Sequence, residues 1–157
     1  MIYPSNFESM IGFDKIREQI VEDCSTLYAK ELAQRLHFIA DYNKIRILLA
    51  QTNEMREIML MDNSFPTGDY ADSYTDVKRL SVPESFLDTK ALVNLKNSLE
   101  TVRALLNFFS NTNEDKYLEL KRLAEPIMYY PAIGQRIDSI LDKFGEIRDN
   151  ASPHLLE

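Results

Sequence analysis

The segment LDTKALVNLKNSLETVRALLNFF, residues 87–109, constrains the fold more than any other part of the sequence. Large apolar residues recur in it at intervals of three and four positions, which places them on one side of an α-helix. This spacing is the a/d pattern through which helices pack closely against other helices. The series consists of Leu92, Leu95, Leu99, Val102, Leu106 and Phe109, and Leu105 and Phe108 widen it towards its end. So wide a stripe favours the core of a multi-helix bundle over a two-stranded coiled coil.

Similar apolar spacing runs through most of the chain and predicts an all-α protein. Capping residues and helix breakers divide the pattern into separate helices. The expected elements are a helix from Phe13, one capped by Ser25, one capped by Asp41, a loop over 62–74, a short turn over 76–80, the helix over 88–109, one over 114–124 and one from Pro131 to a break at Gly145. We expect an irregular multi-helix bundle of about seven helices, with residues 1–151 as one helical core segment.

The composition excludes several functional classes for this segment on its own. Its formal net charge is -7 and no run of Lys and Arg occurs, whereas binding to phosphates needs a cationic surface. Cys24 is the single cysteine, so no disulfide forms within the chain, which fits a reducing compartment. Because Cys24 continues an apolar helical series, we expect a buried structural thiol. No apolar stretch of transmembrane length occurs, and we expect a cytoplasmic protein without a membrane partner.

Residues able to carry chemistry are scattered along the chain. Neither G-x-x-x-x-G-K-[ST] nor G-x-G-x-x-G occurs, so no phosphate-binding loop is expected. The two histidines, His37 and His154, would need carboxylates from distant positions to form a metal site. Asp138 and Asp142 are four positions apart on a predicted helix and could share a divalent cation, although a solvated charged edge is the commoner role of such pairs. We therefore assign no catalytic, cofactor-binding or metal-binding residue.

Four stretches together resemble a known family. They are YPSNFESMIGFDKIREQI, LLAQTNEMREIM, LDTKALVNLKNSLETVRALL and RIDSILDKFGEIRDNASP. They resemble the N-terminal core and lever region of the second bacterial MutS-type paralogue, here called the MutS-II branch. Within that branch, their amino-acid sequences look most similar to those from the Bacteroidetes. The most specific part is D-x-x-G-x-I-x-D-x-A-S-P, which begins at Asp142 and is similar to the run into the long lever helix of MutS-type proteins.

The resemblance implies that the chain is part of a larger protein. MutS-type proteins, which include DNA mismatch repair proteins, are dimeric ATPases that clamp nucleic acid structures. In the MutS-II branch, lever helices lead to a clamp, and a Walker-type domain that uses ATP and Mg follows, usually with a C-terminal endonuclease domain. The branch is associated with suppression of homologous DNA recombination and, in some bacteria, with rescue of collided ribosomes, a form of ribosome quality control. The implied partners are the lever, clamp and ATPase domain of the same chain, a homodimer of the parent, and DNA or a ribosome bound through other domains.

For this segment the resemblance implies a non-catalytic role, because the family's Walker lysine and nuclease residues have no counterpart in it. Residues 152–157 are expected to begin a truncated lever helix, since Ser152 suits a helix cap and Pro153 suits a first turn. Leu156-Glu157 is interpreted as a cloning scar. Phe144-Gly145-Glu146 spells the Phe-x-Glu motif of mismatch-reading MutS proteins, but Phe144 continues an apolar series and is expected to pack.

Three functional hypotheses follow from these observations. The first is a mechanical relay, in which a rigid helical body links the ATPase module to the lever and clamp. The second is a free-standing helical adaptor that binds a partner helix in an apolar groove. The third is a small acidic enzyme that uses Asp138 and Asp142 with a divalent cation.

Overall fold

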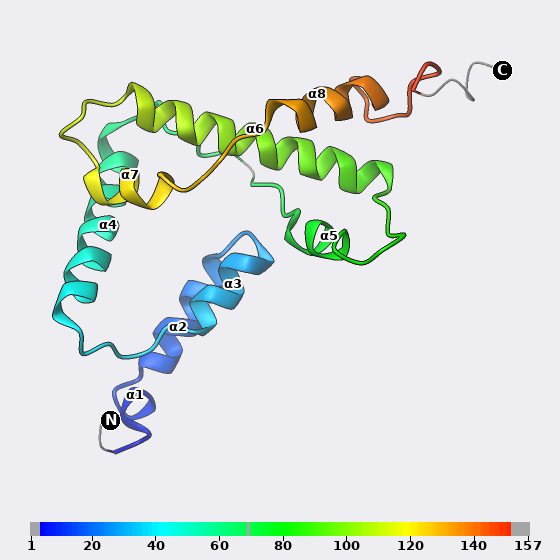
Figure 1. The fold of residues 1–157 in the computed structure, drawn as a ribbon. Coiled ribbons are helices and arrows are strands. Elements are labelled where there is room, and N and C mark those ends of the chain that lie inside the picture. Colours follow the sequence, from blue (N-terminus) through cyan, green and yellow to red (C-terminus); the bar gives the residue numbers. More distant parts are fainter. Residues whose placement is uncertain (1–3, 69, 152–157) are drawn as a thin grey trace.

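A computed structural model describes residues 4–68 and 70–151 as an all-α protein (Figure 1). The helices are α1 (Phe7–Met10), α2 (Phe13–Asp23), α3 (Leu27–Gln34), α4 (Tyr42–Met61), α5 (Tyr74–Arg79), α6 (Thr89–Asn111), α7 (Leu118–Ala124) and α8 (Pro131–Ile140). This confirms the predicted all-α class, with eight helices in the described ranges. The expectations for residues 152–157, including the start of a lever helix, His154 and the cloning scar, lie outside the described residues.

Three of the helices begin at a residue whose side chain caps the first turn. The Asp41 carboxylate accepts the N–H of Lys44 at 3.0 Å, as predicted. The Asp88 carboxylate accepts the N–H of Ala91 at 2.8 Å, at the start of the helix expected from about residue 88. The expected cap at Ser25 is wrong by one position. Thr26 has the extended backbone that a cap requires, and its hydroxyl accepts the N–H of Ala29 at 3.2 Å.

The last two helices are shorter than their apolar patterns indicate. The helix expected to start at Glu114 starts at Leu118, because Tyr117 takes a left-handed backbone with φ of 56° that no α-helix contains. The last helix ends at Ile140 rather than near Gly145, and Leu141 and Ile147 form an antiparallel bridge in a tight turn. A side chain on Gly145 would come within 2.9 Å of Val93 on α6, so this turn depends on glycine.

The expectation that Phe144 packs is wrong. Helix α8 has already ended before this residue, so Phe144 does not continue the face that begins at Ile133. Its ring lies at the tip of the turn and is 77% exposed, with the Lys143 ammonium 4.8 Å from the ring centroid.

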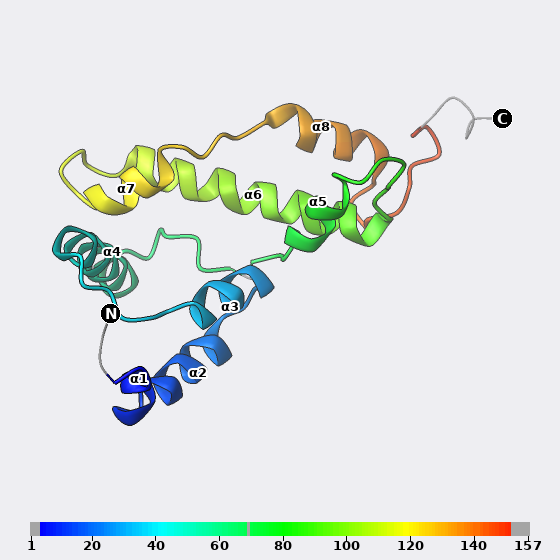
Figure 2. The same ribbon diagram turned by 60° about the horizontal axis from the view of Figure 1, so that its bottom comes forward.

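The helices form an open frame rather than a closed bundle (Figures 1 and 2). Helix α4 forms one side, α6 with α7 and α8 forms the second, and the antiparallel pair α2–α3 forms the third. Two contacts join the start of α3 to α5 and the residues just before it. The N–H of Leu27 donates to the Asp72 carboxylate at 2.5 Å, and the Tyr28 and Tyr74 rings lie with centroids 4.9 Å apart.

A small aromatic cluster joins α4 to the α6–α7 side. Ile58 of α4 is fully buried, and Phe65, Phe108 and Tyr117 surround it. The Phe108 ring meets Phe65 edge-on at 5.1 Å and stacks on Tyr117 at 6.3 Å between centroids. The left-handed backbone of Tyr117 therefore brings its ring into the core, where the packing offsets the cost of that conformation.

Hydrogen bonds also connect α4 to α7 at this joint. Because of Tyr117, helix α7 has no side-chain cap of its own. The Glu54 carboxylate of α4 supplies one from another element, accepting the N–H groups of Glu119 at 3.1 Å and Leu120 at 2.8 Å. The negative charge of Glu54 also interacts favourably with the positive, N-terminal end of the α7 dipole.

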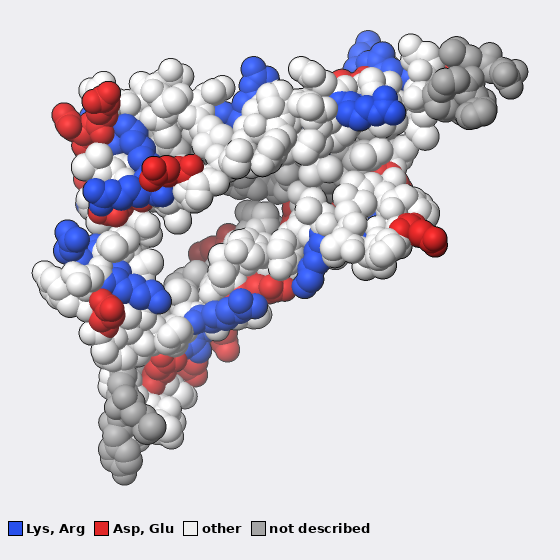
Figure 3. All heavy atoms as spheres, viewed as in Figure 1, with Lys and Arg blue, Asp and Glu red and all other residues white. Residues whose placement is uncertain are grey.

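The frame exposes much more surface than a compact protein would. Its accessible surface is 12433 Å², whereas a compact monomer of 18.2 kDa exposes about 8,100 Å². Figure 3 shows the opening between α4, α6 and the α2–α3 pair in space-filling view. Large apolar side chains are exposed on α2, α3, α4 and α5, so much of the apolar pattern in the sequence has no partner within the described residues.

The predicted stripe on α6 is only partly covered. All six of its members are half-buried, whereas the fully buried positions on α6 are Ala91 and Phe108. Helix α8 packs on one side of the stripe and brings Ile137 against it, beside Leu92 and Leu95. The stripe is thus an incomplete helix–helix interface.

We predict that Ile58→Ala lowers the free energy of unfolding by about 2–5 kcal/mol, since it leaves a cavity at the joint of the frame. Met59→Ala is the matched control, because Met59 is the next residue on α4 and is exposed. It should change the stability by less than about 0.5 kcal/mol. Urea unfolding followed by circular dichroism measures both, and equal effects would contradict the assignment of the joint.

Candidate functional site

The structure gives the two acidic residues of the third hypothesis different partners. The Asp138 carboxylate accepts a hydrogen bond from the Lys96 ammonium at 2.6 Å, which ties α8 to α6 and raises the pKa of Lys96. The Asp142 carboxylate accepts the N–H groups of Glu146 at 2.9 Å and Phe144 at 2.8 Å, and these bonds lower the pKa of Asp142. The expected sharing of one helix side is wrong, because α8 ends before Asp142.

The other chemistry-bearing residues also have local partners. The Nδ1–H group of His37 donates to the Arg35 carbonyl at 2.7 Å, since a carbonyl can only accept. The Cys24 thiol donates to the Ile20 carbonyl at 3.1 Å, and Cys24 is half-buried rather than buried as expected. Across residues 4–68 and 70–151, no three His, Cys, Asp or Glu side chains lie close enough together to hold a metal ion.

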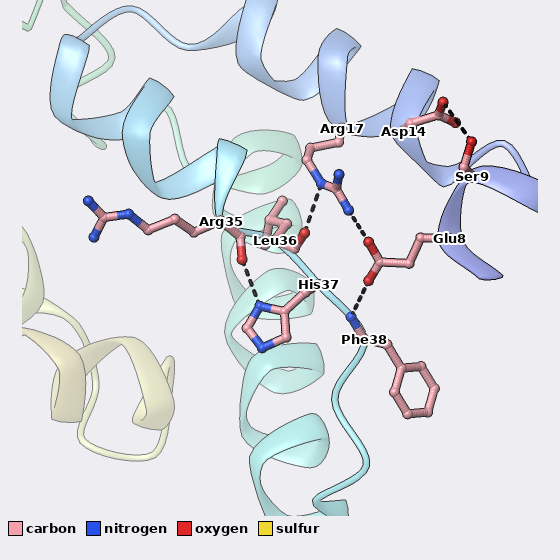
Figure 4. Close-up of polar contacts among 8 residues, drawn as sticks. All are labelled: Glu8, Ser9, Asp14, Arg17, Arg35, Leu36, His37 and Phe38. Carbon is pink, nitrogen blue, oxygen red and sulfur yellow. Dashed lines mark hydrogen bonds and ion pairs between the residues drawn. The ribbon is translucent and has the colours of Figure 1, made fainter. Parts of the chain in front are cut away.

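The main long-range polar cluster joins α1 and α2 to the linker before α4 (Figure 4). Arg17 of α2 lies between the Glu8 carboxylate, with which it forms an ion pair, and the Leu36 carbonyl, which accepts its Nε–H at 2.8 Å. The second oxygen of Glu8 accepts the N–H of Phe38 at 2.7 Å. The Phe38 N–H and then the Arg17 guanidinium hold the pKa of Glu8 below its usual range.

The contacts of Glu8 and Arg17 with residues 36–38 are called here the polar clamp, as distinct from the clamp domain of MutS-type proteins. An apolar groove of about 470 Å³ lies beside it, between α1, the linker and the first half of α4. Phe38 follows the clamp directly, and its ring meets Phe7 edge-on with 6.5 Å between centroids. The groove residues are Phe7, Glu8, Ile11, Phe13, His37, Phe38, Ile39, Ile45, Leu48, Leu49 and Thr52. Such a lining suits an apolar side chain of a protein partner. Its polar side chains already have partners, because Glu8 bonds within the polar clamp, His37 to the Arg35 carbonyl and Thr52 to the Leu48 carbonyl.

Sequence patterns did not reveal this site. The apolar positions of α2 and α4 were recognised, but nothing in their spacing indicated that Glu8 and Arg17 would hold residues 36–38. The site depends on a half-buried charge pair formed across a chain reversal, which only the three-dimensional structure brings together.

The sequence of the chain is similar to segments of several known proteins. The chain is 28% identical over 147 residues to endonuclease MutS2 of Alkaliphilus metalliredigens, covering 93% of the chain and 18% of that protein. It is 25% identical over 148 residues to endonuclease MutS2 of a Geobacillus species, covering 93% and 19%. It is 29% identical over 149 residues to endonuclease MutS2 of Leuconostoc mesenteroides, covering 92% and 18%.

The chain is thus homologous along nearly its whole length to a segment of these proteins, and it spans about a fifth of their length. The resemblance to the MutS-II branch is confirmed at this level. No protein-family model matches the chain. No solved structure matches it either.

We predict that Glu8→Gln destabilises the protein near neutral pH and that this effect disappears in acid. The folded-state pKa of Glu8 is lower than its unfolded value of about 4.5, so the carboxylate contributes stability above pH 4.5. That contribution is lost as the pH falls through the lower, folded-state pKa. Urea unfolding of wild type and variant from pH 7 to pH 3 measures the difference.

Glu18→Gln on the exposed side of α2 is the matched control for this series. Its stability should follow the wild type at every pH. A difference between Glu8→Gln and wild type that stays constant down to pH 3 would contradict a stabilising role of the ionised Glu8 carboxylate.

Proposed function

We propose that this chain is a non-catalytic helical core segment of a longer MutS2-type protein, in which it links an ATPase module to a lever and clamp. The observation that carries the proposal is the similarity to endonuclease MutS2 proteins over 93% of the chain but only 18% of their length. The open frame supports it, since its exposed apolar surfaces need more protein to cover them.

The frame suits a mechanical role. Helix α4 and the α6–α8 side meet at the Ile58 cluster and at the Glu54 cap, so a displacement of one side changes the angle of the other at a defined joint. A rigid element with a defined joint can pass on a two-state change between distant sites. ATP and Mg act in the parent's ATPase domain in this proposal.

The partners in this proposal belong to the longer protein. They are the rest of the same polypeptide, a second parent subunit, and DNA or a ribosome bound through other domains. The cellular role is suppression of homologous recombination or rescue of stalled ribosomes in the cytoplasm, in a species of the Bacteroidetes. In the part of the chain that the structure describes, no helix combines the length and apolar character needed to cross a membrane.

The test uses the longer protein with Glu54→Ala, which removes the cap that joins α4 to α7. We expect ATP hydrolysis in the absence of nucleic acid to stay near the wild-type rate, while the response of hydrolysis to added DNA or ribosomes falls. Glu57→Ala is the control, because Glu57 lies one turn further along α4 and bonds only to Asn53 of the same helix.

Two results would contradict this proposal. One is loss of basal hydrolysis in the Glu54→Ala protein while the fold is retained. The other is DNA cleavage or ATP hydrolysis by the 157-residue chain alone.

A further inference from the structure

The first three helices form a unit that is separate from the rest of the frame. Close helix packing joins α1 to α2 and α2 to α3, and among the described helices no packing of this extent joins the unit to a later helix. The polar clamp adds the linker to the same unit as far as residue 38. Asp41 then caps α4, which belongs to the next side of the frame. Residues 4–38 are therefore called the N-terminal arm, and residues 39–40 connect this arm to α4.

The far end of the N-terminal arm meets the segment 71–74, where the turn between α2 and α3 lies beside α5 (Figures 1 and 2). One oxygen of the Asp72 carboxylate accepts the N–H of Leu27 at 2.5 Å, and the other accepts the N–H of Tyr74 at 3.1 Å. The Tyr74 ring also lies against the Tyr28 ring of α3. A single carboxylate thus joins the first turn of α3 to the first turn of α5.

The same segment is anchored on α6 by a half-buried hydroxyl group. The Ser73 hydroxyl donates to the Ser98 hydroxyl at 2.9 Å, and the Ser98 hydroxyl donates to the Ala71 carbonyl at 2.7 Å. Residues 71 and 73 therefore bond to α6, while residues 72 and 74 contact α3. The segment is a bridge that is fixed to the frame on one side and holds the N-terminal arm on the other.

We propose that Asp72 is a latch that holds the N-terminal arm against the frame, and that the arm rotates as one body about residues 39–40 when this latch opens. Water can replace both latch contacts. The N–H of Leu27 belongs to the first turn of α3, where it has no helical partner, so water satisfies it after opening. Tyr28 and Tyr74 are 48% and 37% exposed, so their contact also lies at the surface. Ile58 at the opposite joint is fully buried, and that joint stays closed.

The polar clamp keeps the arm intact during this rotation. Glu8 and Arg17 both belong to the arm, and so do the groups that they hold, so no bond of the polar clamp crosses residues 39–40. A short connection between two rigid parts is the usual form of a hinge. A part of a protein that few contacts hold to the rest can open while the rest stays folded.

Opening the latch changes the apolar groove at the other end of the arm. Helix α1 and the start of α2 line one wall of this groove, the first half of α4 lines the other, and Ile39 lies between them. Because the arm carries one wall and α4 carries the other, rotation about residues 39–40 alters the width of the groove. The latch therefore controls, from the far end of the arm, how well the groove accepts an apolar side chain.

The first test measures the distance between the arm and α6 in the 157-residue chain by pulsed electron spin resonance. In a Cys24→Ser background, Glu22→Cys and Asn107→Cys place spin labels at exposed positions on α2 and α6. We expect one narrow distance population while Asp72 is intact. Asp72→Ala should add a second population at longer distance, because the arm is then free to rotate away from the frame.

Asp76→Ala is the matched control, because the Asp76 carboxylate pairs with Arg79 within α5 and does not reach α3. It should leave the single distance population unchanged. Circular dichroism shows whether each variant keeps its helix content. If Asp72→Ala loses helix content, Tyr28→Ala takes its place in the test, since it removes the ring contact and leaves the hydrogen bonds of the latch.

The second test distinguishes rotation of an intact arm from unfolding of the arm. Hydrogen exchange by NMR follows the Leu27 N–H, which bonds to Asp72, and the Phe38 N–H, which bonds to Glu8 inside the arm. We expect Asp72→Ala to raise the exchange rate of the Leu27 N–H about tenfold and to leave that of the Phe38 N–H unchanged.

Four results would overturn the proposal. The first is a broad distance population with Asp72 intact. The second is an unchanged population in Asp72→Ala, or in Tyr28→Ala where that variant takes its place. The third is an effect of Asp76→Ala equal to that of Asp72→Ala, and the fourth is equal acceleration of exchange at Leu27 and Phe38. The inference does not rest on the proposed relay function.

Discussion

The packing of three aromatic rings around Ile58 is the interaction on which the frame depends. Helix α4 reaches the α6–α7 side through this cluster, and the Glu54 carboxylate completes the same joint by capping α7. The unusual backbone of Tyr117 belongs to this arrangement, because it ends the preceding turn and places the ring on Phe108. Loss of the joint would leave the two sides connected by the chain 62–88 and by the contacts near Tyr74.

Local signals in the sequence predicted the helices well. Asp41 caps its helix as expected, and Asp88 does the same at the start of α6, since a carboxylate next to an amphipathic run satisfies the first free N–H groups. The apolar spacing of α6 placed that helix almost to the residue. Ser25 was mistaken for a cap because Ser and Thr have similar capping strength, and the backbone angle that selects Thr26 cannot be read from composition.

Tertiary relations were predicted less well. Phe144 has the right spacing to extend α8, but the Asp142 carboxylate takes up the N–H groups of the following turn and the helix has already ended. The expected placement of Asp138 and Asp142 on one side of a single helix was wrong for the same reason. The clamp of Glu8 and Arg17 forms across a chain reversal, and no periodic pattern encodes such a contact. Periodicity shows which side of a helix is apolar, but not which sides are covered.

The surplus of exposed apolar surface links the fold to the proposed roles. A chain that buried all its apolar stripes internally would be a closed bundle with little left for other domains or subunits. Here Ile58 is fully buried, while Leu49, Leu60 and Met61 of the same helix are exposed. This division agrees with a segment that spans about a fifth of the proteins it resembles and that other parts of a larger assembly cover.

The measurement that tests the open frame most directly is small-angle X-ray scattering of the chromatographically separated monomer. A compact protein of 157 residues has a radius of gyration of about 15 Å. The open frame predicts a clearly larger radius, together with the helix content expected from eight helices. A radius of about 15 Å at the same helix content would show that the helices close into a compact bundle, and it would contradict the account.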